Sequence, residues 1–172
     1  TSDISLADAT MGFERLLKRS MKLRNVSDVP VSIALSGGLD SSLNLFYSDK
    51  ISKKKIQCIN ISYEETSKFD ESVIAEKFSE ETGADFYSKK ITSFDFETWL
   101  NDYQSVQHDT PCGDINTSML YGLSLFSRKK KAKVMLVGEG GDELGGYPIY
   151  KRLFVFQKIF KSLPMFFWNF IS

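Results

Sequence analysis

Residues 35–42 read Leu35-Ser36-Gly37-Gly38-Leu39-Asp40-Ser41-Ser42, and this stretch decides the fold. It follows an apolar run, residues 29–34, that is typical of a buried strand, and it precedes residues 43–47, which predict a short helix. Glycines allow a sharp turn and a close approach of a ligand to the backbone. A helix N-terminus presents unpaired N–H groups and the positive end of its dipole. The order of strand, glycine turn and helix therefore predicts an anion-binding site.

Polar side chains in the same stretch are suited to a phosphate and a metal ion. The hydroxyls of Ser36, Ser41 and Ser42 can donate hydrogen bonds, and the carboxylate of Asp40 can hold Mg²⁺ against phosphate oxygens. A Walker loop would carry a lysine, which is absent here. We therefore expect pyrophosphate to be held by backbone and hydroxyl groups, with the metal supplying positive charge. A turn that uses its glycines for geometry alone is the alternative.

A second glycine loop, residues 138–147, reads Gly138-Glu139-Gly140-Gly141-Asp142-Glu143-Leu144-Gly145-Gly146-Tyr147 and directly follows the apolar strand 134–137. Further strands are expected at 56–63 and 84–91, with helices at 5–24, 70–82, 94–103 and 116–127. Strands separated by helices predict a doubly wound α/β fold, with a mainly parallel sheet and helices on both faces. Both glycine loops would then lie at one edge of the sheet, where Asp40 and Asp142 could share Mg²⁺.

Residues 36–42 resemble the pyrophosphate loop of the ATP-pyrophosphatase superfamily. Together with residues 138–147, they resemble the synthetase domain of glutamine-hydrolysing asparagine synthetase, and residues 69–71 and 109–111 are shorter matches. The resemblance runs from about Leu6 to about Tyr150. It implies a fold of the adenine nucleotide alpha hydrolase type, with a synthetase core at residues 1–150 and a helical segment at residues 151–172.

The resemblance also implies an activity, a ligase reaction of asparagine biosynthesis. Aspartate would be activated by ATP as β-aspartyl-AMP with release of pyrophosphate, and ammonia would then attack it. Glu139 would be the catalytic residue, and Ile61 would lie against adenine. The expected ATP-binding residues are Ala34, Leu35, Ser36, Gly37, Gly38, Asp40, Ser41, Ser42, Ile61 and Gly138.

Several departures from the family pattern keep alternatives open. The usual Asp-Glu-Pro is Asp109-Thr110-Pro111 here, the second loop lacks an aromatic residue between Leu144 and Gly145, and Val137 replaces a frequent serine. A related amidotransferase acting on another carboxylate is one alternative, and a non-catalytic nucleotide-binding module is another. The glutaminase domain with its nucleophilic cysteine is not found in residues 1–172, so ammonia is expected from elsewhere.

Composition excludes several classes. The 172 residues carry a formal net charge of zero, which argues against nucleic acid or an anionic membrane as partner. The sequence contains no run of about twenty apolar residues, so it predicts no membrane span. The sequence has too few zinc ligands for a Cys/His zinc site, since it contains one histidine, His108, and two cysteines, Cys58 and Cys112. His108 is expected in a loop without a visible partner. Two isolated cysteines fit a cytoplasmic protein. The aromatic residues 165–171 are expected to pack on a partner, such as a second copy, or on polypeptide outside residues 1–172.

Overall fold

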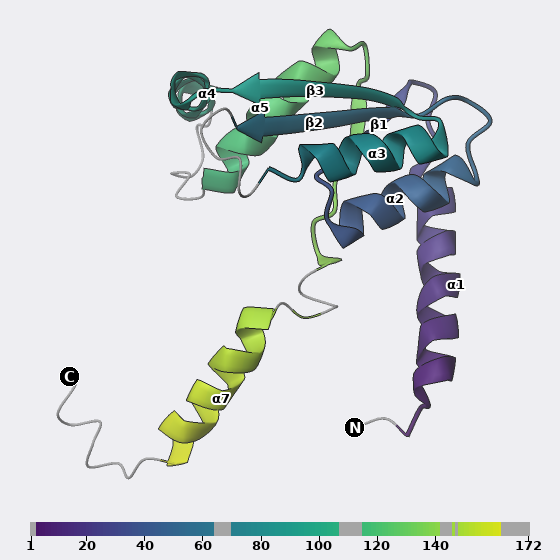
Figure 1. Ribbon diagram of the computed structural model, residues 1–172, viewed down its shortest axis with the longest axis vertical. Helices are drawn as coiled ribbons and strands as arrows, with labels where there is room; N and C mark the ends of the chain where they lie inside the picture. Colours follow the sequence, from purple (N-terminus) through teal and green to yellow (C-terminus); the bar gives the residue numbers. More distant parts are fainter. Residues whose placement is uncertain (1–2, 64–69, 107–114, 142–145, 147, 163–172) are drawn as a thin grey trace, which may run out of the picture. The chain divides into compact units, whose positions relative to one another are not determined.

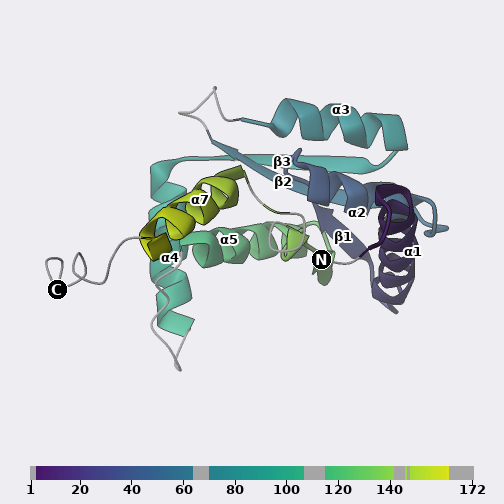
Figure 2. The ribbon, with the colours of Figure 1, turned by 90° about the horizontal axis from the view of Figure 1, so that it is seen from below.

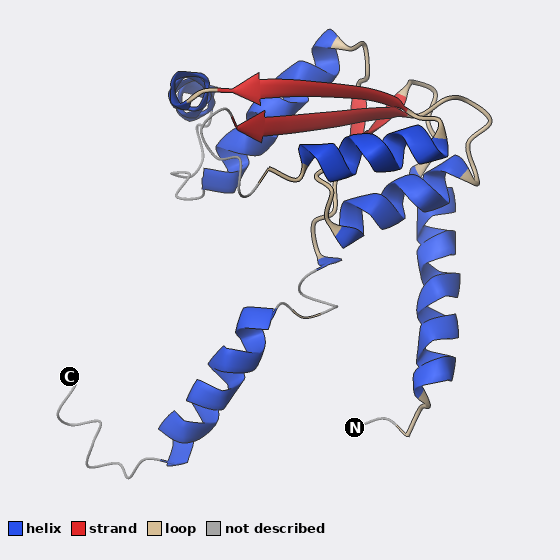
Figure 3. Cartoon of the chain, in the orientation of Figure 1, coloured by secondary structure: helices blue, strands red, loops and turns tan. Residues whose placement is uncertain are grey.

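The computed structural model describes residues 3–63, 70–106, 115–141, 146 and 148–162. Its centre is a four-stranded sheet with the order β3-β2-β1-β4, in which every neighbouring pair is parallel. Figure 3 shows strands in red and helices in blue. The strands are β1 (Val31–Ala34), β2 (Gln57–Tyr63), β3 (Asp85–Ile91) and β4 (Val134–Leu136). The described helices are α1 (Leu6–Arg24), α2 (Leu39–Asp49), α3 (Ser72–Thr82), α4 (Ser93–Val106), α5 (Ile115–Lys129) and α7 (Pro148–Ser162).

The strand order explains how the helices come to cover both faces. The chain runs outward from β1 through β2 to β3 and then returns to place β4 on the other side of β1. Because parallel crossovers are right-handed, this reversal of direction moves the connecting helices to the opposite face. In Figure 1, α2 and α3 lie beneath the strands, and in Figure 2, α3 and α5 lie on opposite sides of them. The predicted doubly wound, parallel α/β fold is confirmed.

The core lies between the sheet and helices α2 and α3. Strand register aligns one residue from each strand on this face, namely Ile33, Cys58, Phe86 and Leu136. These four side chains belong to one hydrophobic cluster with Leu45 of α2 and with residues of α3. Burial raises the pKa of the Cys58 thiol to about 12, so this cysteine is the inert core residue that its apolar surroundings predict.

The opposite face of the sheet is covered by α5. Ser32 of β1 is fully buried there, and its Oγ lies 3.0 Å from Oγ of Ser127 at the C-terminal end of α5. At the outer edge, α4 packs against α5, where the Trp99 ring occupies the space that a side chain on Gly122 would need. A glycine in this helix therefore serves close packing.

Local sequence signals account for the helix ends. Ser5 caps α1 by accepting a hydrogen bond from the Asp8 N–H at 3.1 Å, and Gly83 ends α3 in the left-handed conformation at φ 69°. The expectation for α2 needs a correction, because the helix begins at Leu39 rather than near residue 43. Gly38 is its N-cap, and Ser42 N–H already donates to the Gly38 carbonyl at 3.1 Å. The polar residues of the first glycine loop thus form the first helical turn.

The chain divides into two compact units, Thr1–Gly138 and Glu139–Ser172. Gly138, the first residue of the second glycine loop, ends the first unit, and Glu139 begins the second. The expected division into a core of residues 1–150 and a helical segment of residues 151–172 stays a prediction. Helix α7 of the second unit exposes more than half of the Leu153, Phe154 and Phe156 side chains. Among the described residues, no helix is long and apolar enough to cross a membrane.

Candidate functional site

The first glycine loop is held by a closed ring of hydrogen bonds. Gly38 N–H donates to Ser36 Oγ at 3.2 Å, and Ser36 Oγ lies 3.0 Å from Ser41 Oγ. Ser41 Oγ donates its only proton to the Gly38 carbonyl at 3.0 Å, so Ser36 must be the donor between the two hydroxyls. The loop is therefore ordered by its own side chains, and both hydroxyls already have partners before any ligand arrives.

The N-terminus of α2 is open to an anion. Its N-cap, Gly38, has no side chain with which to cap it, so the N–H groups of the first turn have no partner within the helix. Asp40 and Ser41 belong to this turn, and Ser41 is buried whereas Asp40 is half-buried. Backbone donors and the positive end of the helix dipole converge here, as the sequence predicted.

Position 37 must be a glycine, without a side chain, for two reasons. Its φ is +97°, a region that residues with a side chain rarely adopt. A Cβ at this position would also lie 2.7 Å from the carbonyl oxygen of Glu71, the N-cap residue of α3. The adjacent Asp70 accepts hydrogen bonds from Ser72, which lower the pKa of its carboxyl group. The loop and the start of α3 therefore fit closely together.

An apolar pocket of about 170 Å³ adjoins the loop. It lies between the C-terminal ends of β1 and β2 and the side of α5. Its lining residues are Ala34, Leu35, Ser36, Ile59, Asn60, Ile61, Met119, Leu120 and Leu123. Four residues expected at the nucleotide, namely Ala34, Leu35, Ser36 and Ile61, thus line one cavity. An apolar pocket beside an anion-binding turn can accept a flat base on one side and phosphates on the other.

Gly138 joins the same edge of the sheet from β4. A Cβ on Gly138 would lie 3.2 Å from the Cβ of Asp40, so the backbone after β4 packs directly on the first turn of α2. Asn44 of α2 secures this approach, because its Nδ2 donates to the Val137 carbonyl at 3.1 Å. The structure therefore brings Gly138 beside Asp40, and their contact with one nucleotide stays a prediction.

The remaining site predictions concern the second glycine loop and residues 108–112. Glu139, at the start of the second unit, is exposed. Asp142 lies outside the described residues, as do His108, Cys112 and the 109–111 match. Within the described ranges, no group of three or more His, Cys, Asp or Glu side chains could hold a metal ion. The assignments of Glu139 to catalysis and of Asp40 with Asp142 to Mg²⁺ remain predictions.

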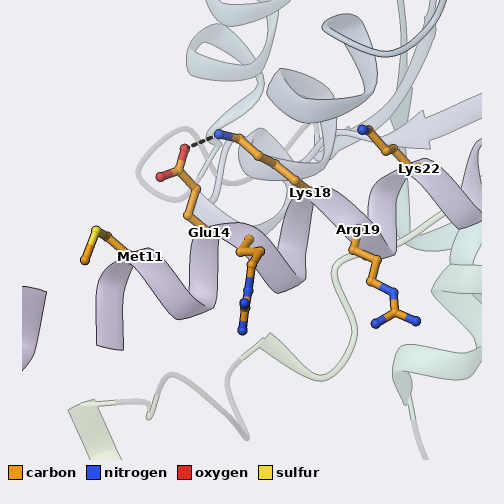
Figure 4. A pocket seen from close by; sticks show the side chains of 6 residues that line it. Met11, Glu14, Lys18, Arg19 and Lys22 are labelled. Carbon is orange, nitrogen blue, oxygen red and sulfur yellow. Dashed lines mark ion pairs between the residues drawn. The ribbon is translucent and has the colours of Figure 1, made fainter. Parts of the chain in front are cut away.

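A larger hollow of about 460 Å³ lies along α1, away from this chemistry (Figure 4). All of its described lining residues come from that one helix, namely Met11, Glu14, Arg15, Lys18, Arg19 and Lys22. Lys18 points to Glu14 and pairs with it at 2.6 Å, while Arg19 extends away from both. Because this is one open, solvated helix face, the smaller pocket beside the glycine loop is the candidate site despite its size.

Sequence reasoning missed Asn60 and the three apolar residues of α5. Asn60 is almost fully buried, and its Nδ2 donates to the Leu35 carbonyl at 2.8 Å. The signal for Asn60 is a carboxamide between two isoleucines, Ile59 and Ile61, of a predicted strand. Met119, Leu120 and Leu123 are the apolar face of a predicted helix, and only the fold reveals which strands that face covers.

The family model described as asparagine synthase matches residues 12–170. A putative glutamine-hydrolysing asparagine synthetase 2 of Methanocaldococcus jannaschii is 33% identical over 140 residues, which cover 78% of this chain and 26% of that protein. The protein named Amidase chry2 of Gibberella zeae is 26% identical over 164 residues, which cover 84% of this chain and 23% of that protein.

Among solved structures, a glutamine-dependent NAD⁺ synthetase from Acinetobacter baumannii in complex with ADP aligns with a TM-score of 0.49 and 23% identity, over 75% of this chain and 26% of that chain. This chain spans about a quarter of the length of the curated relatives it matches. The family model nevertheless matches nearly all of its residues, from 12 to 170. The chain therefore belongs to the asparagine synthase family.

Proposed function

We propose that this chain binds ATP with Mg²⁺ for an amide-forming ligase reaction, in which aspartate is activated as an acyl-adenylate and ammonia then attacks it. The observation that carries the proposal is that the glycine loop and the apolar pocket have residues in common. Leu35 and Ser36 line the apolar pocket, and Ser36 also belongs to the hydrogen-bonded glycine loop. A pocket that adjoins an anion-binding loop in this way suits a ligand with an apolar base at one end and phosphates at the other.

Each part of the site has a separate task in this proposal. The pocket beside Ile61 holds the adenine, and the first turn of α2 holds the β- and γ-phosphates through backbone N–H groups. Asp40, with Asp142 from the second loop, would bind Mg²⁺, which neutralises phosphate charge and makes pyrophosphate a better leaving group. Glu139 would act on the acyl-adenylate step. Ammonia is proposed to come from another domain or chain, and the cytoplasm is the proposed location.

Hydrogen-bond counting adds a condition for phosphate binding. The hydroxyl protons of Ser36 and Ser41 are already donated inside the loop. A phosphate oxygen that accepts a bond from either hydroxyl must therefore open the ring, whereas a bond from the open N–H groups of α2 leaves the ring intact. We infer that the backbone groups make the first contact and that the hydroxyls rearrange afterwards.

The decisive test is Mg·ATP binding followed by aspartate-dependent exchange of label between pyrophosphate and ATP. Asp40→Ala removes the proposed metal ligand, and Asp49→Ala, at the other end of the same helix, is the matched control. We expect the Asp40 variant to lose Mg·ATP affinity at least tenfold and the Asp49 variant to bind like the wild type. Unchanged binding by the Asp40 variant contradicts the metal assignment, and a wild-type chain that binds no ATP contradicts the whole proposal.

A second candidate keeps the ATP chemistry and changes the acid. Thr110 replaces the family's usual carboxylate, and one relative is named an amidase rather than a synthetase. A panel of carboxylates in the same exchange assay discriminates between aspartate and another acid as the substrate, because only the correct acid supports exchange of label. ATP binding without exchange for any acid, in an assay that includes an ammonia source, supports the non-catalytic alternative.

A further inference from the structure

We propose that Asn60 is a positioning residue for the phosphate loop, because it fixes the peptide between Leu35 and Ser36 in the orientation that phosphate binding requires. The inference rests on the proposed function. Asn60 lies on β2, outside the glycine loop, and it would act through the Leu35 carbonyl rather than on the nucleotide.

The geometry is a clamp on both sides of one peptide. The carbonyl of Leu35 and the N–H of Ser36 belong to the same planar trans unit, so they point in opposite directions. The carbonyl accepts from Asn60 Nδ2 at 2.8 Å, and the N–H donates to Ser41 Oγ at 3.2 Å. One contact comes from the neighbouring strand and the other from the first turn of α2. Rotation of this peptide would break both contacts.

The clamp is itself rigid. Asn60 Oδ1 accepts a hydrogen bond from Ser88 Oγ of β3 at 2.9 Å, so the carboxamide is held from both ends. Its orientation is fixed, because the Leu35 carbonyl can only accept and therefore requires the NH₂ group of Asn60. With 3% of its surface exposed, Asn60 carries a polar group into the interior, which is tolerated because both ends are bonded.

The position of the clamp explains why it matters for the loop. The backbone pairing of β1 with β2 ends at Ala34 and Ile59, and the next bond runs from Leu35 N–H to the Ile59 carbonyl. At this point β1 leaves the sheet and the glycine loop begins. The Asn60 side chain donates its hydrogen bond to the Leu35 carbonyl at this point, so it sets the direction in which Ser36 enters the hydrogen-bonded ring.

The test compares Asn60→Leu, which keeps the size of the side chain and removes its donor, with Ser32→Ala. Ser32 is an equally buried, hydrogen-bonded polar residue at the other end of β1, so its loss controls for general destabilisation. We would measure amide hydrogen exchange of Ser36 in the unliganded chain, the affinity for Mg·pyrophosphate and for Mg·ATP, and the melting temperature.

We expect Asn60→Leu to speed exchange of the Ser36 amide and to weaken binding of both ligands about fivefold or more, the size of one net hydrogen bond. Ser32→Ala should lower the melting temperature without either effect. Ser88→Ala, which keeps the bond to Leu35, should give a smaller change of the same kind and serves if Asn60→Leu does not fold. Wild-type Ser36 exchange or wild-type pyrophosphate affinity in the folded Asn60 variant overturns the inference. If the wild type binds neither ligand, the proposed function fails, while the exchange rates still decide whether the clamp exists.

Discussion

Gly37→Ala should destabilise this protein more than Gly38→Ala does, although the two glycines are adjacent. An alanine at Gly37 must adopt φ +97°, which costs about 1–2 kcal/mol in backbone strain. Its Cβ would also lie 2.7 Å from the Glu71 carbonyl oxygen, which cannot move freely. That oxygen accepts hydrogen bonds from Ile74 and Ala75, both at 3.0 Å, in the first turn of α3. Weakening them adds about 1 kcal/mol.

The total of about 2–3 kcal/mol corresponds to a fall in melting temperature of about 4–12 °C for a chain of this length. Gly38 has φ −72°, and the nearest atom to an added Cβ is the Ser36 side-chain oxygen at 3.3 Å. We expect that variant to lose about 1 kcal/mol at most, from the poorer N-cap. Thermal unfolding followed by circular dichroism measures both. Equal melting temperatures for the two variants would refute the reasoning, because the difference depends only on the geometry of this turn.

Three further predictions follow from the packing and the pKa values. Gly122→Ala should lower the free energy of unfolding by about 1–3 kcal/mol, because the Trp99 indole of α4 fills the space of an added Cβ. Gly12→Ala, with nothing within 4 Å of an added Cβ, should raise it by about 0.5–1 kcal/mol. Urea unfolding measures both, and changes of the same sign and size in the two variants would contradict this prediction. Cys58, with a pKa of about 12, should resist alkylation at pH 9 until the protein is unfolded, and rapid labelling of the native protein, read by peptide mass spectrometry, would show that the thiol is accessible. The hydrogen bonds from Lys89 and Thr92 lower the pKa of Asp95 to about 2. The stabilisation by the ionised Asp95 is therefore present above about pH 4 and is lost as the pH falls toward 2. The difference in unfolding free energy between the wild type and Asp95→Asn should narrow over that range, and a constant difference would contradict the assignment.

The agreement between sequence and structure is greatest where the signal is local. The order of strand, glycine turn and helix at residues 31–49 is confirmed, since apolar runs and turn residues act over a few positions. The start of α2 was expected too late, because Leu39 and the polar residues after it do not show helical apolar spacing. What makes them helical is the cap conformation at Gly38, together with the hydrogen bond from Ser42 to its carbonyl.

The candidate site was predictable in part for the same reason. Loop residues carry their chemistry in their own sequence, so Ser36 and Asp40 could be identified directly. Ile61 was assigned through a family resemblance, and the fold places it in the pocket. The α5 wall of that pocket could not be assigned, because apolar spacing marks a helix face without naming the strands beneath it.

The sequence alone determined the parallel α/β fold class, the family and the polar residues of the first glycine loop, because these depend on short-range patterns. The tertiary structure alone decided which distant groups hold that loop. Asn60 meets the Leu35 carbonyl across 25 residues of sequence, and Ser88 meets Asn60 across 28. Such contacts arise from the register of parallel strands, since parallel pairing brings residues from separate crossovers side by side. No local pattern records that register.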